Sequence, residues 1–128
     1  MVCAAAGKNS CCQWCGMCYY SPVSYELREY IEGSVSPFAK WFRGLSAVAA
    51  ARVDRYLRRL EQGNFGNCRS VGGGVYEVRV DYGPGYRVYY GEDQGRWIIL
   101  LGGGDKRRQS QDIGVAIDRW RAYKQRRS

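Results

Sequence analysis

Histidine is absent from this 128-residue sequence, and that absence excludes more mechanisms than any other feature of its composition. Without an imidazole group the chain cannot build a Ser-His-Asp or Cys-His hydrolase, a two-histidine ribonuclease or a histidine-bound metal site. No apolar run approaches the roughly 20 residues that a membrane-spanning helix requires, so we expect no membrane association. The length suits one ordinary domain and is too small for two.

Positive charge and aromatic rings are what the chain has in abundance. It carries 20 lysines and arginines against 12 acidic residues, for a net charge of +8, together with eleven tyrosines and four tryptophans. Arginine predominates, because only Lys8, Lys40, Lys106 and Lys124 are lysines. A guanidinium group binds phosphate through two parallel hydrogen bonds, so this composition indicates a nucleic acid or an acidic protein as partner. The alternative is a basic surface that serves solubility alone.

The first 22 residues differ from the rest, since they hold five of the six cysteines and a single charged residue. A metal or cluster site on Cys12, Cys15 and Cys18 is one interpretation, but a zinc ribbon needs a second cysteine pair and only Cys68 lies elsewhere. A secreted, disulfide-linked segment is another, although the apolar stretch at residues 2–6 is too short for a signal sequence.

We therefore expect residues 1–22 to be a dispensable, disordered extension that binds no metal, with the working protein beginning near Met17. Residues 23–128 then form the single domain. Because no export signal is recognisable, we expect this domain to be cytoplasmic and its thiols to be reduced.

Periodicity beyond Ser24 predicts the order β-α-α-β-β-β-α, an α+β class in which consecutive strands form an antiparallel meander. Residues 24–31 alternate as a first strand. Ser36 and Ser46 are N-cap candidates for two helices that form an αα-hairpin, and Gly63 suits the position just after the second helix. The apolar stripe of this second helix consists of Val48, Ala49, Val53, Tyr56, Leu57 and Leu60.

The second half of the chain predicts three strands and a final helix. Residues 75–82 alternate strictly, residues 86–90 return after a Gly-Pro-Gly turn, and residues 96–101 form an apolar run typical of a strand buried on both faces. We expect the glycine triplet before the first of these strands to be a flexible lead-in, and the triplet 102–104 to end the third. The last helix is expected to begin near Ser110.

A hairpin loop of three residues would place Asp81 opposite Arg87 and Arg79 opposite Tyr89. One face of the sheet would then show these four side chains together with Glu77. Two arginines, two carboxylates and a tyrosine can hold a phosphate group. The alternative is an ordinary solvated face, whose ion pairs each contribute at most about 1 kcal/mol.

Several motifs, taken in order, are similar to those of one known protein family. They are residues 63–67 (GNFGN), 74–79 (GVYEVR), 82–90 (YGPGYRVYY) and 101–106 (LGGGDK), followed by Gln109, Asp112 and Ile113. Together they resemble the HigB-like branch of the RelE/ParE toxin superfamily, the phage-type addiction module killer proteins. The resemblance implies a small single α+β domain with a curved antiparallel RelE-like sheet, an N-terminal αα-hairpin and a C-terminal helix. It also implies a toxin–antitoxin system of type II, with a helix-turn-helix antitoxin as partner.

Relatives of the RelE and HigB type cleave mRNA, usually on the ribosome. The resemblance therefore implies a metal-independent endoribonuclease that uses no small-molecule cofactor and has the ribosome and mRNA as partners. Arg87 matches a phosphate-binding arginine of these enzymes, and Lys106 lies near another of their basic catalytic positions. Glu77 and Arg79 lie where such enzymes often carry two lysines, so the acidic Glu77 departs from the pattern.

In such a reaction a ribose 2′-OH attacks the neighbouring phosphate, and the cations named above stabilise the added negative charge. Glu77 or Asp112 would accept the 2′-OH proton, and Lys106 or Tyr89 would serve as the acid. Arg107, Arg108, Arg119, Arg121 and Lys124 are candidates for binding RNA.

Two other interpretations stay open. Relatives of the ParE type inhibit DNA gyrase, so the resemblance also permits a non-catalytic toxin that blocks a partner. An inactive, phage-derived remnant that keeps the fold is the second. Cleavage of translated mRNA separates the enzyme from both.

Overall fold

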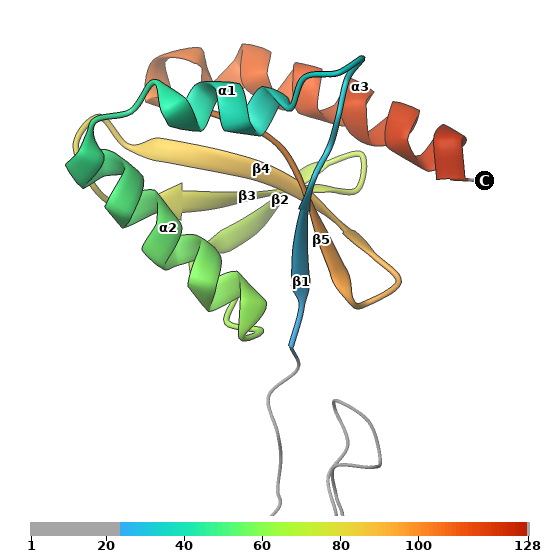
Figure 1. Ribbon diagram of the computed structural model, residues 1–128, viewed down its shortest axis with the longest axis horizontal. Coiled ribbons are helices and arrows are strands. Elements are labelled where there is room, and N and C mark those ends of the chain that lie inside the picture. Colours follow the sequence, from blue (N-terminus) through green and yellow to red (C-terminus); the bar gives the residue numbers. More distant parts are fainter. Residues whose placement is uncertain (1–23, 128) are drawn as a thin grey trace, which may run out of the picture.

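The structure, a computed structural model, describes residues 24–127, which form one sheet with helices on both faces (Figure 1). In chain order the elements are β1 (Glu26–Glu29), α1 (Pro37–Arg43), α2 (Ala47–Glu61), β2 (Cys68–Gly72), β3 (Val75–Val80), β4 (Tyr86–Asp93), β5 (Trp97–Gly104), a 3-10 turn (Lys106–Arg108) and α3 (Gln109–Arg127). The expected small α+β domain with its αα-hairpin and C-terminal helix is confirmed. The predicted extension at 1–22, with its cysteine cluster, lies outside the described residues.

The sheet is mixed, which corrects the expectation of a purely antiparallel one. Its strand order is β1-β5-β4-β3-β2, and β1 runs parallel to β5 while the remaining neighbours are antiparallel. Parallel neighbours need a long connection, and here the αα-hairpin and three strands supply it. Because β1 comes first in sequence but lies at an edge beside the last strand, no local pattern reveals this pairing.

Strand β2 is absent from the order predicted from the sequence. Its five residues, CRSVG, show no alternation of apolar and polar side chains, and they become a strand by pairing with β3. The expected flexible lead-in is a tight turn between these strands, since Gly72, Gly73 and Gly74 all have positive φ angles of 104°, 62° and 86°. Glycine adopts this conformation without steric cost, which explains the triplet.

The helices α1 and α2 begin where the N-cap residues predict. Ser36 Oγ accepts a hydrogen bond from the Ala39 amide at 3.0 Å, and Ser46 Oγ accepts one from the Ala49 amide at 3.2 Å. Val48, expected in the apolar stripe of α2, is 54% exposed because it lies on the outer side of the first turn. None of the helices in residues 24–127 is long and apolar enough to cross a bilayer.

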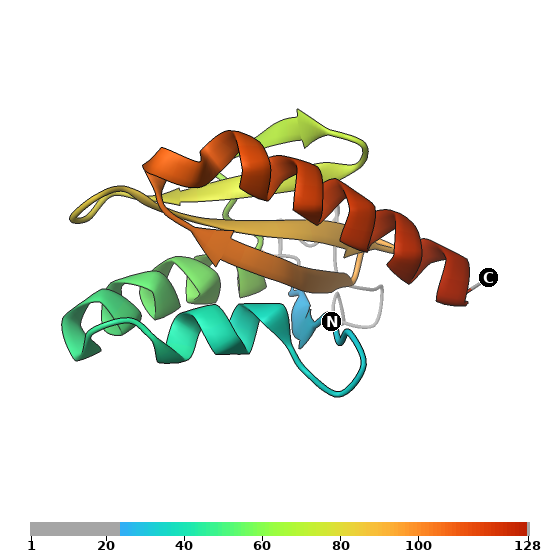
Figure 2. The ribbon, with the colours of Figure 1, turned by 90° about the horizontal axis from the view of Figure 1, so that it is seen from above.

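Helices lie on both faces of the sheet (Figure 2), and each face carries its own apolar core. Helices α1 and α2 cover one face, where Val53 and Leu57 pack against Val78 and Val88. Helix α3 covers the other, where Trp120 packs against a second cluster that includes Tyr89 and Leu101. The apolar run 98–101 of β5 is buried and contributes alternate residues to both cores, as predicted for a strand covered on both faces.

The β3–β4 hairpin has a different register from the one predicted. Arg79 pairs with Arg87 and Glu77 pairs with Tyr89, so the connection spans residues 81–85 rather than three residues. Asp81 has left the ladder, and its amide donates to the Tyr56 hydroxyl at 3.4 Å. The observed register differs from the predicted one by two residues. Side chains alternate with a period of two, so each stays on its predicted face of the sheet.

Candidate functional site

Glu77 on β3 lies on the sheet face that α3 covers, and its side chain is only 1% exposed. Its Oε2 atom accepts a hydrogen bond from Gln109 Nε2 at 2.8 Å and lies 3.6 Å from Arg87 Nε. Its Oε1 atom accepts a hydrogen bond from Arg69 Nε at 3.0 Å. This face is therefore not the solvated one that an alternating sequence also permitted. The carboxylate is enclosed, and three side chains from different elements engage it.

Arg87 is also buried, with 7% of its side chain exposed. Besides its contact with Glu77, its Nη1 group donates to the Gly85 carbonyl at 3.0 Å. The Arg87 Nε group makes no hydrogen bond among the described residues, so the Nη1 hydrogen bond and the ion pair with Glu77 position the guanidinium. The Gly85 carbonyl belongs to the hairpin connection, so the turn itself positions Arg87.

Exposed cations surround this buried pair. Arg79 lies beside Arg87 in the ladder and, with Arg69 and Asn67, lines a small hollow of about 230 Å³ next to Glu77. Lys106 lies at the other side of the hairpin turn: a Cβ atom on Gly85 would be 3.9 Å from the Lys106 Cβ and 3.5 Å from Arg87 Nη1. Arg79, Arg87 and Lys106 therefore form a contiguous group, which we call the hairpin cluster.

The 3-10 turn that carries Lys106 is capped by Asp105. The Asp105 carboxylate accepts a hydrogen bond from the Arg107 amide at 3.0 Å and pairs with the Arg107 guanidinium at 3.2 Å. Desolvation raises the pKa of Asp105, but the hydrogen bonds and charge of Arg107 outweigh it and lower that pKa overall. The ionised cap holds the turn at the end of β5 and so places Lys106 beside the hairpin.

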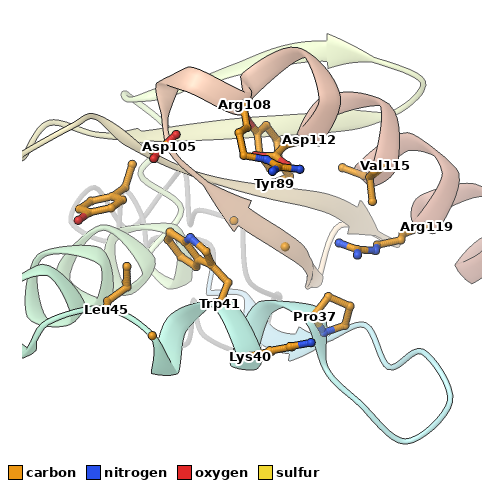
Figure 3. Close-up of a pocket in the computed structure, with 15 residues that line it drawn as sticks. Pro37, Lys40, Trp41, Leu45, Tyr89, Asp105, Arg108, Asp112, Val115 and Arg119 are labelled. Carbon is orange, nitrogen blue, oxygen red and sulfur yellow. The ribbon is translucent and has the colours of Figure 1, made fainter.

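A cleft of about 670 Å³ opens between α1 and α3, next to the hairpin cluster (Figure 3). Lys40, Trp41 and Leu45 lie on the α1 side, and Asp112, Val115 and Arg119 on the α3 side. Gly102 and Gly103 of β5 run between the two sides, with Trp41 on one face of the sheet and Tyr89 on the other. The remaining lining residues are Pro37, Gly44, Tyr86, Asp105, Arg108 and Ala116.

The glycines 102–104 belong to β5, which corrects the expectation that they merely end the strand. Their missing side chains let both helices approach the backbone. A Cβ atom on Gly103 would collide with the Trp41 ring, and one on Gly104 would collide with the Asp112 carboxylate. A Cβ atom on Gly102 would lie 2.7 Å from Arg119 Nη1. The triplet therefore shapes the cleft. Three consecutive glycines within a strand were the feature of the sequence that could have predicted this close approach.

Two polar atoms in the cleft are buried and have no hydrogen-bond partner among the described residues: Asp112 Oδ2 and Arg119 Nε, of which Arg119 Nε lies 3.7 Å from Glu32 Oε1 in an ion pair. Burial, followed by the negative charges of Glu77 and Asp112, raises the pKa of Tyr89, whose hydroxyl therefore stays protonated. Burial is also the main cause that raises the pKa of Asp112. Unsatisfied buried polar groups are uncommon and call for a specific explanation.

The predicted site residues thus fall into two neighbouring groups and a remainder. Glu77 with the hairpin cluster forms one group, and Tyr89, Arg108, Asp112 and Arg119 line the cleft. Arg107 pairs with Asp105 on the connecting turn. Arg121 and Lys124 line neither group; Arg121 pairs with Asp118 at 3.2 Å, and the Lys124 ammonium lies 5.8 Å from the centre of the Trp120 ring. Sequence reasoning gave no role to Arg69, Gln109, Lys40 or Trp41.

Residues 40–121 match a protein family described as "Phage derived protein Gp49-like (DUF891)". The chain belongs to this family. The matched segment begins on α1 and ends on α3, so both walls of the cleft and the whole hairpin cluster lie within the Gp49-like region.

A protein of Haemophilus influenzae is similar to this chain, with 44% identity over 80 residues. The aligned part covers 62% of this chain and 81% of the relative, which is described as an uncharacterized protein. Within residues 24–127, no group of three or more cysteine, aspartate or glutamate side chains lies close enough together to hold a metal ion.

Proposed function

We propose that this Gp49-like protein is the toxin of a type II toxin–antitoxin system and an endoribonuclease that cleaves translated mRNA. The observation that carries the proposal is the hairpin cluster, in which exposed Arg79 and Lys106 flank a guanidinium, Arg87, that Glu77 and a backbone carbonyl hold in place. Cations fixed on rigid strands are suited to stabilising the charge that develops on an attacked phosphate.

The reaction is attack of a ribose 2′-OH on its neighbouring phosphate, with a 2′,3′-cyclic phosphate and a free 5′-OH as products. Arg79, Arg87 and Lys106 stabilise the pentavalent phosphorane, and Lys106 also protonates the departing 5′ oxygen. The ammonium of Lys106 is exposed and can approach that oxygen.

Of the two candidate bases, Asp112 is better suited than Glu77 to accept a proton. The Glu77 carboxylate accepts hydrogen bonds from Arg69 and Gln109 and forms an ion pair with Arg87, which leaves it as a positioning residue for Arg87. Asp112 keeps an unpaired oxygen atom and has a raised pKa because of burial, so its ionised form is a stronger proton acceptor than an ordinary aspartate. Asp112 therefore accepts the 2′-OH proton.

The proposal includes a helix-turn-helix antitoxin, the ribosome and mRNA as partners, and a cytoplasmic location. The Gp49-like family and the basic surface support it. A non-catalytic toxin that blocks a target such as DNA gyrase is the competing function. The exposed arginines on α2, such as Arg55, suit a binding surface of that kind as well as they suit rRNA.

Brief expression without an antitoxin tests the proposal. Primer extension on several abundant transcripts should show new 5′ ends only in translated regions, and plasmid supercoiling should stay normal. Loss of supercoiling while transcripts stay intact would establish the competing function. Normal growth with both intact would identify an inactive remnant.

A further inference from the structure

The small hollow beside Glu77 has the charge and the polarity of an anion site. Its volume is about 230 Å³, and its lining consists of Gly66, Asn67, Cys68, Arg69, Glu77 and Arg79. Glu77 is the single acid among these six residues, and its carboxylate is already engaged by Arg69, Arg87 and Gln109. The hollow therefore presents positive charge and hydrogen-bond donors to a ligand.

Arg69 is anchored at one end and open at the other. Its Nε group donates to Glu77 Oε1 at 3.0 Å, whereas its side chain as a whole is 63% exposed. Neither of its Nη groups has a hydrogen-bond partner within residues 24–127. Because the Glu77 carboxylate is buried and held by other side chains, it fixes the guanidinium while the Nη groups stay available. Two such donors on one guanidinium suit the oxygens of a phosphate group.

Asn67 supplies a second donor from the loop that precedes β2. Its carbonyl accepts a hydrogen bond from the Arg79 amide at 3.0 Å, which holds the loop against β3. Its Oδ1 atom accepts from Arg59 Nη1 at 3.3 Å. With the oxygen occupied, the Nδ2 group of Asn67 is the part of the amide that can donate to a ligand in the hollow.

The hollow lies in one row with the groups that carry the proposed chemistry. Across the sheet this row consists of Asn67, Arg79, Arg87 and Gly104, with the Asp112 carboxylate lying against Gly104. Neighbouring strands are about 4.8 Å apart, so the hollow lies roughly 10 Å from Arg87. One nucleotide can bridge this distance, and Arg79 lies midway.

The direction of an RNA strand along this row follows from the position of the proposed base. Asp112 accepts the 2′-OH proton on the β5 side of Arg87. The attacking and leaving oxygens of a phosphoryl transfer lie roughly in line, so the departing 5′ oxygen and its nucleotide lie on the opposite side, over β3. The phosphate on the 3′ oxygen of that nucleotide then reaches the hollow.

We propose that the hollow binds the RNA phosphate that follows the scissile one on its 3′ side. Arg69 and the Nδ2 group of Asn67 contact this phosphate, and Arg79 lies between the two phosphates. The inference rests on the proposed function, because it takes the scissile phosphate to lie at the hairpin cluster. Phosphate contacts fix the register of a nucleic acid without reading its bases, so this subsite positions the RNA strand.

Binding of uncleavable dinucleotides to the full chain tests the subsite. A 2′-methoxy group on the first ribose removes the nucleophile. Three forms are compared by NMR titration: one without a terminal phosphate, one with a 3′-terminal phosphate and one with a 5′-terminal phosphate. Inorganic phosphate is the fourth probe. We expect the 3′-phosphate to raise the affinity about tenfold and to shift the amide signals of Asn67, Arg69 and Arg79, and the 5′-phosphate to do neither.

Replacing Arg69 should remove this gain in affinity. Arg69→Gln takes away the charge and the paired Nη donors. Arg58→Gln is the matched control, because Arg58 is also exposed and also pairs with a glutamate, Glu61, at 2.6 Å. We expect the tenfold gain from the 3′-phosphate to disappear in Arg69→Gln and to persist in Arg58→Gln. Melting temperatures check that both variants fold.

A second variant tests the hollow without touching the Glu77 contact. Asn67→Asp keeps the oxygen that accepts from Arg59, and its new negative charge repels a phosphate. Asn64→Asp adds the same charge to the same loop but outside the lining of the hollow. The gain in affinity should disappear in Asn67→Asp and persist in Asn64→Asp.

Four results would overturn the inference. They are an equal gain from the 5′-phosphate, a gain that survives in Arg69→Gln and Asn67→Asp, an equal loss of the gain in the two controls, and no shift of the three amides with any dinucleotide at millimolar concentration. Inorganic phosphate that binds as tightly as the 3′-phosphorylated dinucleotide would reduce the hollow to an adventitious anion site and would overturn it too.

Cleavage in cells separates this inference from the proposed function. If the unaltered protein cuts transcripts but the 3′-phosphate adds no affinity, the subsite fails and the ribonuclease proposal stands. If the 3′-phosphate binds through Arg69 but no transcript is cut, the ribonuclease proposal fails while the phosphate subsite is established.

Discussion

Glu77 and Arg87 form a buried pair across the β3–β4 hairpin, with Glu77 Oε2 at 3.6 Å from Arg87 Nε and 1% and 7% of the two side chains exposed. Their positions on one face follow from strand alternation, but their burial does not. Helix α3 covers this face, and Gln109 from its first turn donates to Glu77. The pair therefore belongs to the interior, and its contribution to stability differs from that of a surface ion pair.

Removing one partner of this pair should destabilise the fold strongly. We expect Arg87→Ala to lower the free energy of unfolding by about 3 kcal/mol, because it leaves Glu77 as a buried charge with fewer partners. On a solvated face the loss would be at most about 1 kcal/mol. Arg58→Ala is the control, because Arg58 pairs with Glu61 at 2.6 Å but is 48% exposed. Urea unfolding of both variants measures the difference, and equal losses would contradict it.

Substitutions of the two exposed residues of the hairpin cluster test catalysis without a large effect on stability. Arg79→Ala and Lys106→Ala should each lower the rate of mRNA cleavage about a hundredfold, since each removes a cation that stabilises the attacked phosphate. Their melting temperatures should stay within a few degrees of the unaltered protein, because both side chains are exposed. The control Arg55→Ala, on α2, should change neither the rate of mRNA cleavage nor the melting temperature. A fully toxic Lys106→Ala variant would remove this residue from the site.

Two glycines near the cleft should respond to alanine in opposite ways. At Gly103 the new methyl group collides with the Trp41 ring, which cannot rotate away like the end of a short side chain, so Gly103→Ala should displace α1 or unfold the protein. At Gly114, within α3, the methyl group meets nothing within 4 Å, and the variant should gain up to about 1 kcal/mol from helix propensity. Thermal unfolding of the two variants tests this contrast. A stable Gly103→Ala variant would show that the Trp41 ring does not lie against β5.

Asp112 should make stability fall as the pH rises through the acid range. Burial, the first cause, raises its pKa in the folded state, so the folded protein binds a proton that the unfolded chain has released. Its stabilising effect is therefore present below the ordinary aspartate pKa of about 3.9 and is lost as the pH passes the raised value. Urea unfolding at several pH values should show a flatter profile for Asp112→Asn. An unchanged profile would contradict a raised pKa.

The predicted dispensability of residues 1–22 is tested by truncation. A chain that begins at Met17 should fold and arrest growth like the full chain. Elemental analysis of the purified full chain provides the second measurement. Stoichiometric zinc or iron that disappears on replacing Cys12, Cys15 and Cys18 would establish a metal site instead.

Local chemistry determined much of this fold. Ser36 and Ser46 mark the starts of α1 and α2 because their hydroxyls accept from backbone amides only three residues away. The alternation of β3 sorted Glu77 and Arg79 onto one face, since side chains in a strand alternate whatever the strand pairs with. These features depend on neighbours in sequence, so the sequence by itself predicts them.

Tertiary pairing decided the rest. Strand β2 exists because β3 offers it hydrogen bonds, and β1 is parallel to β5 although some seventy residues separate them. The cleft depends on the same kind of contact. Trp41 and Asp112 approach β5 from opposite helices, and only three glycines in a row leave them room. Such contacts join segments that are distant in the chain, so no periodicity encodes them, and packing alone brings the basic hairpin and the cleft together.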